Sequence, residues 1–218
     1  MLPSLADMYV GGSYQWTTRY SNLDDLHLMV GFGLGDPLDA IGVEAVLTSV
    51  SAFRRGARGK VVTSFKASRM LVHGIAFAAG IEGVRLTGGT ANTEQQSVYG
   101  AVSKVVDLNI PGVPKGYLSS VTLNVGGGNG QFCGEEILNG APHGVDDCGV
   151  SVVASAGLRA AEWAGLIADW TGQDLAIFAS LTPFKKLPIV IAPGFADVAG
   201  GGGDGVRFVG GFGMAFKY

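Results

Sequence analysis

The sequence predicts an all-β fold, a closed antiparallel transmembrane β-barrel of about twelve strands. Three observations lead to this prediction. The composition is poor in charge and rich in glycine, no apolar run is long enough for a spanning helix, and hydrophobicity alternates with a period of two along most of the chain. No linker, charge run or low-complexity block divides the chain, so one domain is expected over residues 1–218.

Composition sets this chain apart from ordinary water-soluble domains. Charged residues make up 15% of the sequence, against roughly 25% in typical soluble domains. Glycine contributes 36 of 218 residues, more than twice its usual share of roughly 7%. A surface this poor in charge favours burial in a bilayer. The net charge of −3 and the lack of a basic stripe argue against a nucleic-acid partner.

The three most apolar windows, residues 70–84, 150–168 and 187–198, are interrupted by charged residues or by prolines. A helix that crosses a bilayer needs about 20 mostly apolar residues. A chain that spans lipid without such helices must form a closed barrel, because only helices and barrels satisfy every backbone polar group there.

Alternation is clearest in the last segment of the chain. One face of that segment is apolar and aromatic. The opposite face consists mostly of small residues and carries Arg207 and Lys217 near its ends. Residues 7–18, 26–34, 41–48 and 60–68 alternate in the same way, with Gly, Ser, Thr and a few charges on the second face. A soluble all-β sandwich or lectin-like domain stays open as the alternative, because alternation also occurs in those folds. The apolar face of the last segment consists of Val206, Phe208, Gly210, Phe212, Met214, Phe216 and Tyr218.

Connections between the predicted strands alternate in length. The longer ones are residues 53–59, 85–96, 126–148 and 197–205, and the shorter ones are residues 35–38, 72–73, 158–161 and 183–186. Two connections depart from this rule, residues 109–115 and 170–173. Long loops on one side and short turns on the other are typical of outer-membrane barrels and place both termini in the periplasm. The first residues lack a basic and then apolar signal segment, so we expect a leader to have been removed before residue 1.

Charged residues in the predicted strands are assigned to the lumen, because a Lys or Arg facing lipid costs about 2–4 kcal/mol at the midplane. Placing Lys104 inward puts Tyr99 and Val105 outward. Both signs of charge occur, so the set either selects solutes or braces the lumen through ion pairs. The candidate lumen-lining residues are Glu44, Lys60, Lys66, Glu82, Lys104, Arg159, Glu162 and Arg207.

Cys133 and Cys148 lie in one polar, glycine-rich stretch. An even number of cysteines in an exported protein predicts a disulfide, and two free thiols in a cytosolic protein are the alternative. Aromatic residues near the predicted strand ends are expected to form interfacial girdles. These residues are Trp16, Tyr20, Phe53, Trp163, Trp170, Phe216 and Tyr218.

Catalytic and metal-binding patterns are weak. The three histidines, His27, His73 and His143, show no convincing spacing with a serine and an orienting acid, so no catalytic residue and no enzyme are predicted. The glycine-rich residues 200–205 precede a strand and not a helix, which excludes a phosphate-binding loop. No metal or cofactor is predicted, because a solvated acidic loop is the commoner reading of Glu135, Glu136, Asp146 and Asp147.

The ending FGMAFKY at residues 212–218 resembles the C-terminal signature of bacterial outer-membrane β-barrels. In that family the last strand alternates, ends on an aromatic residue and is read by the barrel-assembly machinery. The segments ADWTGQDL (168–175), PGFAD (193–197) and GDGVRF (203–208) resemble small uncharacterised barrels of cyanobacterial outer membranes. The resemblance implies a bacterial outer-membrane location, with the bilayer and the assembly machinery as partners.

Small twelve-stranded members of this wider class are often narrow channels. By that fold-level analogy, the expected function is porin-like passive diffusion of small polar solutes. The alternative is a structural barrel with a filled lumen, whose outer loops bind partners.

Overall fold

The computed structural model describes residues 6–17, 23–50, 60–87, 96–133, 149–200 and 205–217. They form twelve strands and one short 3-10 helix, η1 (Gly130–Phe132). The strands are β1 (Ala6–Gln15), β2 (Asp25–Leu34), β3 (Gly42–Ser49), β4 (Val61–Met70), β5 (Ile75–Thr87), β6 (Ser97–Asp107), β7 (Ser120–Gly128), β8 (Ser151–Ala161), β9 (Ala164–Trp170), β10 (Leu175–Leu181), β11 (Ile189–Ala196) and β12 (Arg207–Lys217).

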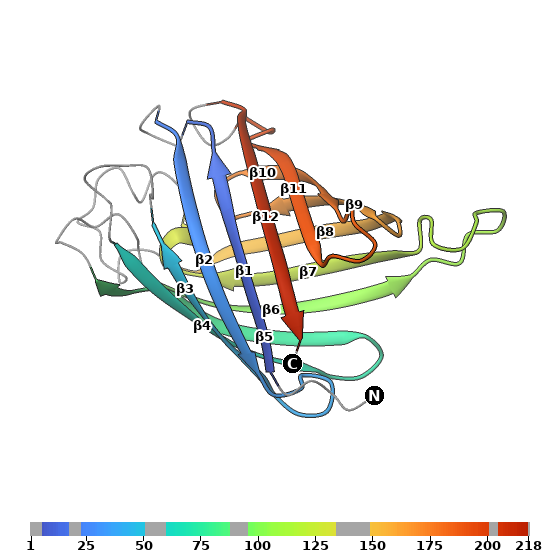
Figure 1. Ribbon diagram of the computed structural model, residues 1–218, viewed down its shortest axis with the longest axis horizontal. Helices are drawn as coiled ribbons and strands as arrows, with labels where there is room; N and C mark the ends of the chain where they lie inside the picture. Colours follow the sequence, from blue (N-terminus) through green and yellow to red (C-terminus); the bar gives the residue numbers. More distant parts are fainter. Residues whose placement is uncertain are drawn as a thin grey trace.

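Each strand pairs with its neighbours in the chain, and β1 closes the sheet against β12 (Figure 1). Every pairing is antiparallel, including the closing one, in which Asp7 lies opposite Lys217 and Gln15 opposite Val209. The predicted closed all-β barrel of twelve strands is therefore confirmed. In the described part of the chain, no helix has the length and apolar character needed to cross a membrane.

The barrel has two distinct ends. Both termini and the β2–β3, β4–β5, β6–β7, β8–β9 and β10–β11 connections share what we call the terminal end (Figure 1). The opposite ends of the strands form what we call the loop end. The β6–β7 connection, residues 108–119, is long for the terminal end and projects well away from the barrel wall in Figure 1. A predicted turn at residues 158–161 is wrong: β8 continues to Ala161 through a register shift, and the turn follows it.

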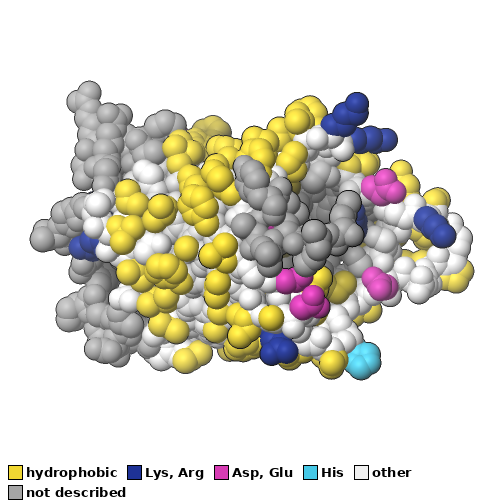
Figure 2. Space-filling view, turned by 60° about the horizontal axis from the view of Figure 1, so that its bottom comes forward, with side chains coloured by type: hydrophobic (Ala, Val, Ile, Leu, Met, Phe, Trp, Pro, Cys, Tyr) yellow, Lys and Arg dark blue, Asp and Glu magenta, His cyan; other side chains and the backbone are white. Residues whose placement is uncertain are grey.

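The two faces of the barrel wall differ in chemistry. Residues directly opposite one another in paired strands share a face, so the register sorts the side chains. Large apolar side chains point outward and are exposed, such as Phe32 (47%), Phe65 (50%) and Val102 (44%). Figure 2 shows them spread over the middle of the outer surface, with most visible charges toward one end. The inner face is mostly small or polar.

The register of β6 corrects one prediction. Lys104 lies opposite Ile75, and Val102 lies opposite Phe77, so both belong to the outer face. Tyr99 and Val105 consequently share the inner face, the reverse of the prediction. Lys104 is at the terminal end of β6, where its ammonium group donates a hydrogen bond to the carbonyl of His73 in the β4–β5 turn. A lysine at a strand end can reach polar groups in this way while its stem stays on the apolar face.

Two tyrosine rings lie flat over inner-face glycines. A Cβ atom built on Gly31 would stand 2.1 Å from the ring of Tyr9 on the neighbouring strand. A Cβ on Gly80 would stand 2.7 Å from the ring of Tyr99 and equally close to the carbonyl oxygen of Phe65. These glycines provide the space that the rings occupy, which explains part of the high glycine content.

Replacing Gly31 by alanine should therefore destabilise the barrel by about 1–3 kcal/mol, the usual range for overpacking. Gly33 provides the matched control, since it is on the same strand and face but its nearest neighbour to an added Cβ is 3.6 Å away. Urea unfolding of both variants measures the difference. Equal stability of Gly31→Ala and Gly33→Ala would show that the ring of Tyr9 moves aside without cost.

Candidate functional site: the barrel lumen

A charged cluster lies on the inner wall where β3, β4 and β5 meet. Glu44 on β3 is directly opposite Lys66 on β4, and their side chains form an ion pair with an Nζ–Oε1 distance of 3.0 Å. Glu82 on β5 faces the same cavity, together with Tyr9 and Tyr99. The cavity has a volume of about 300 Å³. The structure thus brings together three of the predicted lumen residues and adds two phenols to them.

The chain that leaves β7 turns into the lumen instead of away from it. Gln131 of η1 donates a side-chain hydrogen bond to the Glu82 carboxylate. Its backbone carbonyl accepts a hydrogen bond of 2.6 Å from the side chain of Gln173, in the β9–β10 connection. Gln131 therefore links a strand on one side of β7 to a connection beyond β9. We call residues 129–133 the inward segment.

Specific contacts hold the inward segment on the inner face of β6. The backbone N–H of Val98 donates to Asn129 Oδ1 at 2.7 Å, and the N–H of Gln131 donates to Ser97 Oγ at 2.8 Å. The ring of Phe132 meets Tyr99 edge-on, with centroids 6.0 Å apart. Gly130 has φ of +63°, a conformation that favours glycine. These bonds fix Gln131 beside Glu82.

Further open space lies along the inner wall. A cavity of about 360 Å³ is lined by Ser13, Asp25 and His27 on one side and by Phe178 and Gly211 on the other. A second one, of about 350 Å³, lies toward the terminal end of β7–β10. Its inner-face lining is small or polar and includes Thr122, Arg159, Gly165 and Ser180. The part of the lumen enclosed by described residues is therefore incompletely filled by side chains.

Arg207 is on the inner face but is withdrawn from this space. Its Nη2 donates to Asp174 Oδ2 at 2.8 Å, and the two side chains are only 4% and 6% exposed. Lys60 is also buried, immediately before β4, where its carbonyl oxygen accepts a hydrogen bond from Val50. The sequence predicts that both cations line the lumen, but neither Arg207 nor Lys60 lines the three cavities described above.

The remaining two predicted lumen residues lie at the terminal end. Arg159 has inner-face register opposite Ser120, is exposed, and approaches the carbonyl of Glu162 at 3.5 Å. Glu162 is exposed in the β8–β9 turn, because β8 is longer than predicted, and it lines the cavity of about 350 Å³ together with Arg159.

The predicted disulfide involves one described residue. Cys133 ends the inward segment, is 1% exposed, and its Sγ lies 3.8 Å from the carbonyl oxygen of Gly149. Cys148 lies outside the described residues, as do His143 and the acidic residues of that loop. The Cys133–Cys148 disulfide stays a prediction. Within the described ranges, no three His, Cys, Asp or Glu side chains are grouped closely enough to hold a metal ion.

Sequence reasoning missed several inner-face groups. Tyr9, Asp25 and Asp169 have inner-face register, and the period-two pattern could have assigned them. No such signal exists for Gln131, because it follows the end of β7 and reaches Glu82 only through the path of the inward segment.

The chain matches no protein-family model and no curated protein sequence.

Proposed function

We propose that this barrel spans a bacterial outer membrane and allows small polar solutes to pass through a narrow lumen. One observation carries the proposal: the distribution of polarity is inverted relative to a soluble protein. Exposed Leu, Val, Ile and Phe side chains cover the outer face, whereas the inner face holds the Glu44–Lys66 ion pair and its polar surroundings. Soluble monomers rarely expose continuous apolar surface on this scale.

Burial supports the same conclusion. Among the described residues, no Leu, Ile, Phe, Met or Trp side chain is buried, and the buried apolar residues are the small ones. A soluble domain of this length would derive its stability from burying such large side chains. In a bilayer the same side chains contact lipid, and the hydrophobic effect then favours insertion of the barrel. A soluble β-sandwich would need a core of large apolar side chains, and the described residues form no such core.

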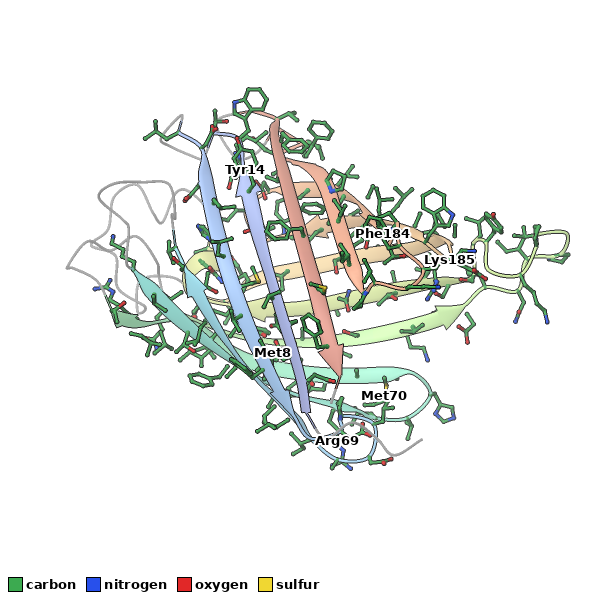
Figure 3. The ribbon with its side chains drawn as sticks, viewed as in Figure 1. Met8, Tyr14, Arg69, Met70, Phe184 and Lys185 are labelled. Atoms are coloured by element: carbon green, nitrogen blue, oxygen red, sulfur yellow. The ribbon has the colours of Figure 1, made fainter. Side chains whose placement is uncertain are left out.

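Aromatic residues are exposed at both ends of the barrel. Trp16 (61%) and Trp170 (39%) are at the loop end. Trp163 (57%) and Phe184 (51%) are at the terminal end, and Figure 3 shows Phe184 beside Lys185 in the β10–β11 connection. Exposed aromatics at both ends are consistent with the girdles that membrane barrels place at the lipid–water interfaces. Of the other predicted girdle residues, Tyr20, Phe53 and Tyr218 lie outside the described residues.

Orientation and assembly follow from the two ends. With long loops outside the cell, the terminal end faces the periplasm. Strand β12 alternates along its length and carries the outward Phe208 and Phe212. We propose that the assembly machinery recognises this strand, as the resemblance of residues 212–218 implies. The predicted Cys133–Cys148 disulfide would fit an oxidising compartment of this kind.

Passage through the lumen is supported by its open space and its polarity. Barrels of eight strands have interiors just wide enough for side chains to fill, and diameter grows with strand number. Twelve strands whose inner face carries many Gly, Ala and Ser residues leave cavities of about 300–360 Å³. Such a lumen suits small hydrophilic solutes.

A structural barrel is the second candidate, and the inward segment favours it. The Glu82–Gln131–Gln173 hydrogen bonds tie that segment across the inner wall at the loop end. If such contacts close the lumen, the barrel would act through its loops.

Single-channel recording of the detergent-refolded protein in a planar bilayer separates the two candidates. We expect discrete current steps in potassium chloride, and altered step size when Gln131 is replaced by alanine beside the Glu82 carboxylate. Gln15→Ala, a change of the same residue type on the inner face of β1, is the control for effects of an amide unrelated to the inward segment. An inserted barrel that stays silent in the wild type and in Gln131→Ala would contradict the channel and favour the structural role.

A further inference from the structure

More acidic than basic side chains of the described residues line the cavity where β3, β4 and β5 meet. Glu44 and Glu82 line the same cavity, and Lys66 is the cation that lines it among the described residues. Lys66 forms the 3.0 Å ion pair with Glu44 and is also close enough to interact electrostatically with Glu82. The hydrogen bond that Glu82 accepts comes from the neutral amide of Gln131. Two carboxylates thus share one ammonium group, and the cavity carries a net charge of −1.

Two further acidic residues lie on the inner face of the barrel. Asp25 lines the neighbouring cavity, and the Nε2 atom of His27 lies 3.3 Å from its carboxylate. Asp169 shares the inner face through its register with Ser155 and Ala176.

The other described cations with inner-face register do not line the cavity of Glu44 and Glu82, and among them is Arg85, which lies opposite Val62. Arg207 is neutralised by Asp174 in a buried pair. Lys60 is buried, at 9% exposure. Arg159 is exposed, but it stands at the terminal end, away from the cavity of Glu44 and Glu82. An ion that passes Glu44 and Glu82 therefore meets two carboxylates and one ammonium group among the described residues that line this cavity.

We propose that the lumen prefers cations and cationic solutes over anions, and that Glu44 and Glu82 together determine this preference. The inference rests on the proposed channel function. Rings of carboxylates produce cation selectivity in other pores because they attract counter-ions and repel co-ions at short range. Lys66 holds the Glu44 side chain in place through the ion pair between β3 and β4. Its single positive charge offsets only one of the two negative charges in the cavity.

The test is the potassium-to-chloride permeability ratio, taken from the reversal potential of the inserted barrel in a potassium chloride gradient. We expect a ratio above one for the wild-type chain. The double variant Glu44→Gln/Glu82→Gln removes both carboxylates and should lower the permeability ratio by roughly two- to tenfold. The effect is of this size because each charge acts on the passing ion over several ångströms through partly aqueous surroundings. Lys66→Gln should raise it.

Asp39→Asn is the matched control, since it removes an exposed carboxylate from the β2–β3 connection outside the lumen. It should leave the ratio unchanged. Circular dichroism and the temperature-dependent gel mobility of refolded barrels show that each variant is folded before recording.

Channels that prefer chloride, or channels whose ratio is the same in the wild type and Glu44→Gln/Glu82→Gln, would overturn the selectivity proposal and leave the channel function standing. A folded and inserted barrel that never conducts would overturn the channel function itself, and with it this inference.

Discussion

Replacing Arg207 by methionine should lower the free energy of unfolding by about 3–5 kcal/mol, the range for breaking a buried ion pair by removing one partner. The change leaves the Asp174 carboxylate, 6% exposed, without the guanidinium that lies 2.8 Å away. Thr171 Oγ1, which donates to the other carboxylate oxygen at 2.9 Å, supplies only a neutral hydrogen bond. Equilibrium unfolding in urea, with the barrel in phospholipid vesicles, measures the loss.

Two variants make this test specific. Arg207→Met combined with Asp174→Asn should recover much of the lost stability, because no uncompensated buried charge remains. Two guanidinium nitrogens of Arg207, Nε and Nη1, have no hydrogen-bond partner among the described atoms, so the ion pair is incompletely satisfied. Replacing both partners should therefore cost less stability than removing Arg207 alone. Lys115→Met, at an exposed position in the β6–β7 connection, should change stability by less than about 0.5 kcal/mol. Equal effects at positions 115 and 207 would contradict a stabilising role of the pair.

Replacing Val102 by lysine should destabilise the inserted barrel by about 2–4 kcal/mol, the cost of a charge facing lipid near the midplane. Val102 is in the middle of β6, on the outer face between Phe77 and Val125. All three side chains are exposed, so in water a lysine here would be nearly neutral. Urea unfolding in vesicles of defined lipid composition measures the change.

Val72→Lys is the matched substitution outside the proposed membrane region. Val72 is in the β4–β5 turn and is 65% exposed. Lysine at this position should leave the unfolding free energy within about 0.5 kcal/mol of the original value. If Val102→Lys is tolerated as well as Val72→Lys, the outer face does not contact hydrocarbon and the membrane proposal fails.

Much of the fold was predictable because each strand has one uniform face. In β12, the apolar residues 208, 212, 214 and 216 alternate with small ones, and the structure keeps that division. In β2 the same holds for Leu28 and Phe32 against the inner-face Gly31. The prediction failed in β6, where Val105 and Val106 are both apolar and Lys104 is charged. Without clear alternation, the cost of a charge in lipid predicts Lys104 to face inward, whereas its position near the strand end lets it reach a turn carbonyl.

The candidate site was less predictable. Glu44, Lys66 and Glu82 could be placed inward because a charge in an apolar membrane is costly. The cost of a charge in lipid does not predict which charged side chains contact one another. The pairing of Glu44 with Lys66 depends on the β3–β4 register, and the contact of Gln131 with Glu82 depends on how the chain turns after β7.

The sequence by itself determined the closed all-β architecture, the number of strands and most of the inward and outward faces. These properties depend on local patterns: alternation with period two, low charge, and the absence of an apolar run long enough for a helix. Tertiary structure alone decided which charges are neutralised and which remain in the lumen. Arg207 and Lys66 look equivalent in sequence, yet Arg207 is buried against Asp174, and Lys66 stays in the cavity between two carboxylates. The reason is that electrostatic interactions depend on distances between residues far apart in the chain, and only the closure and register of the barrel determine those distances.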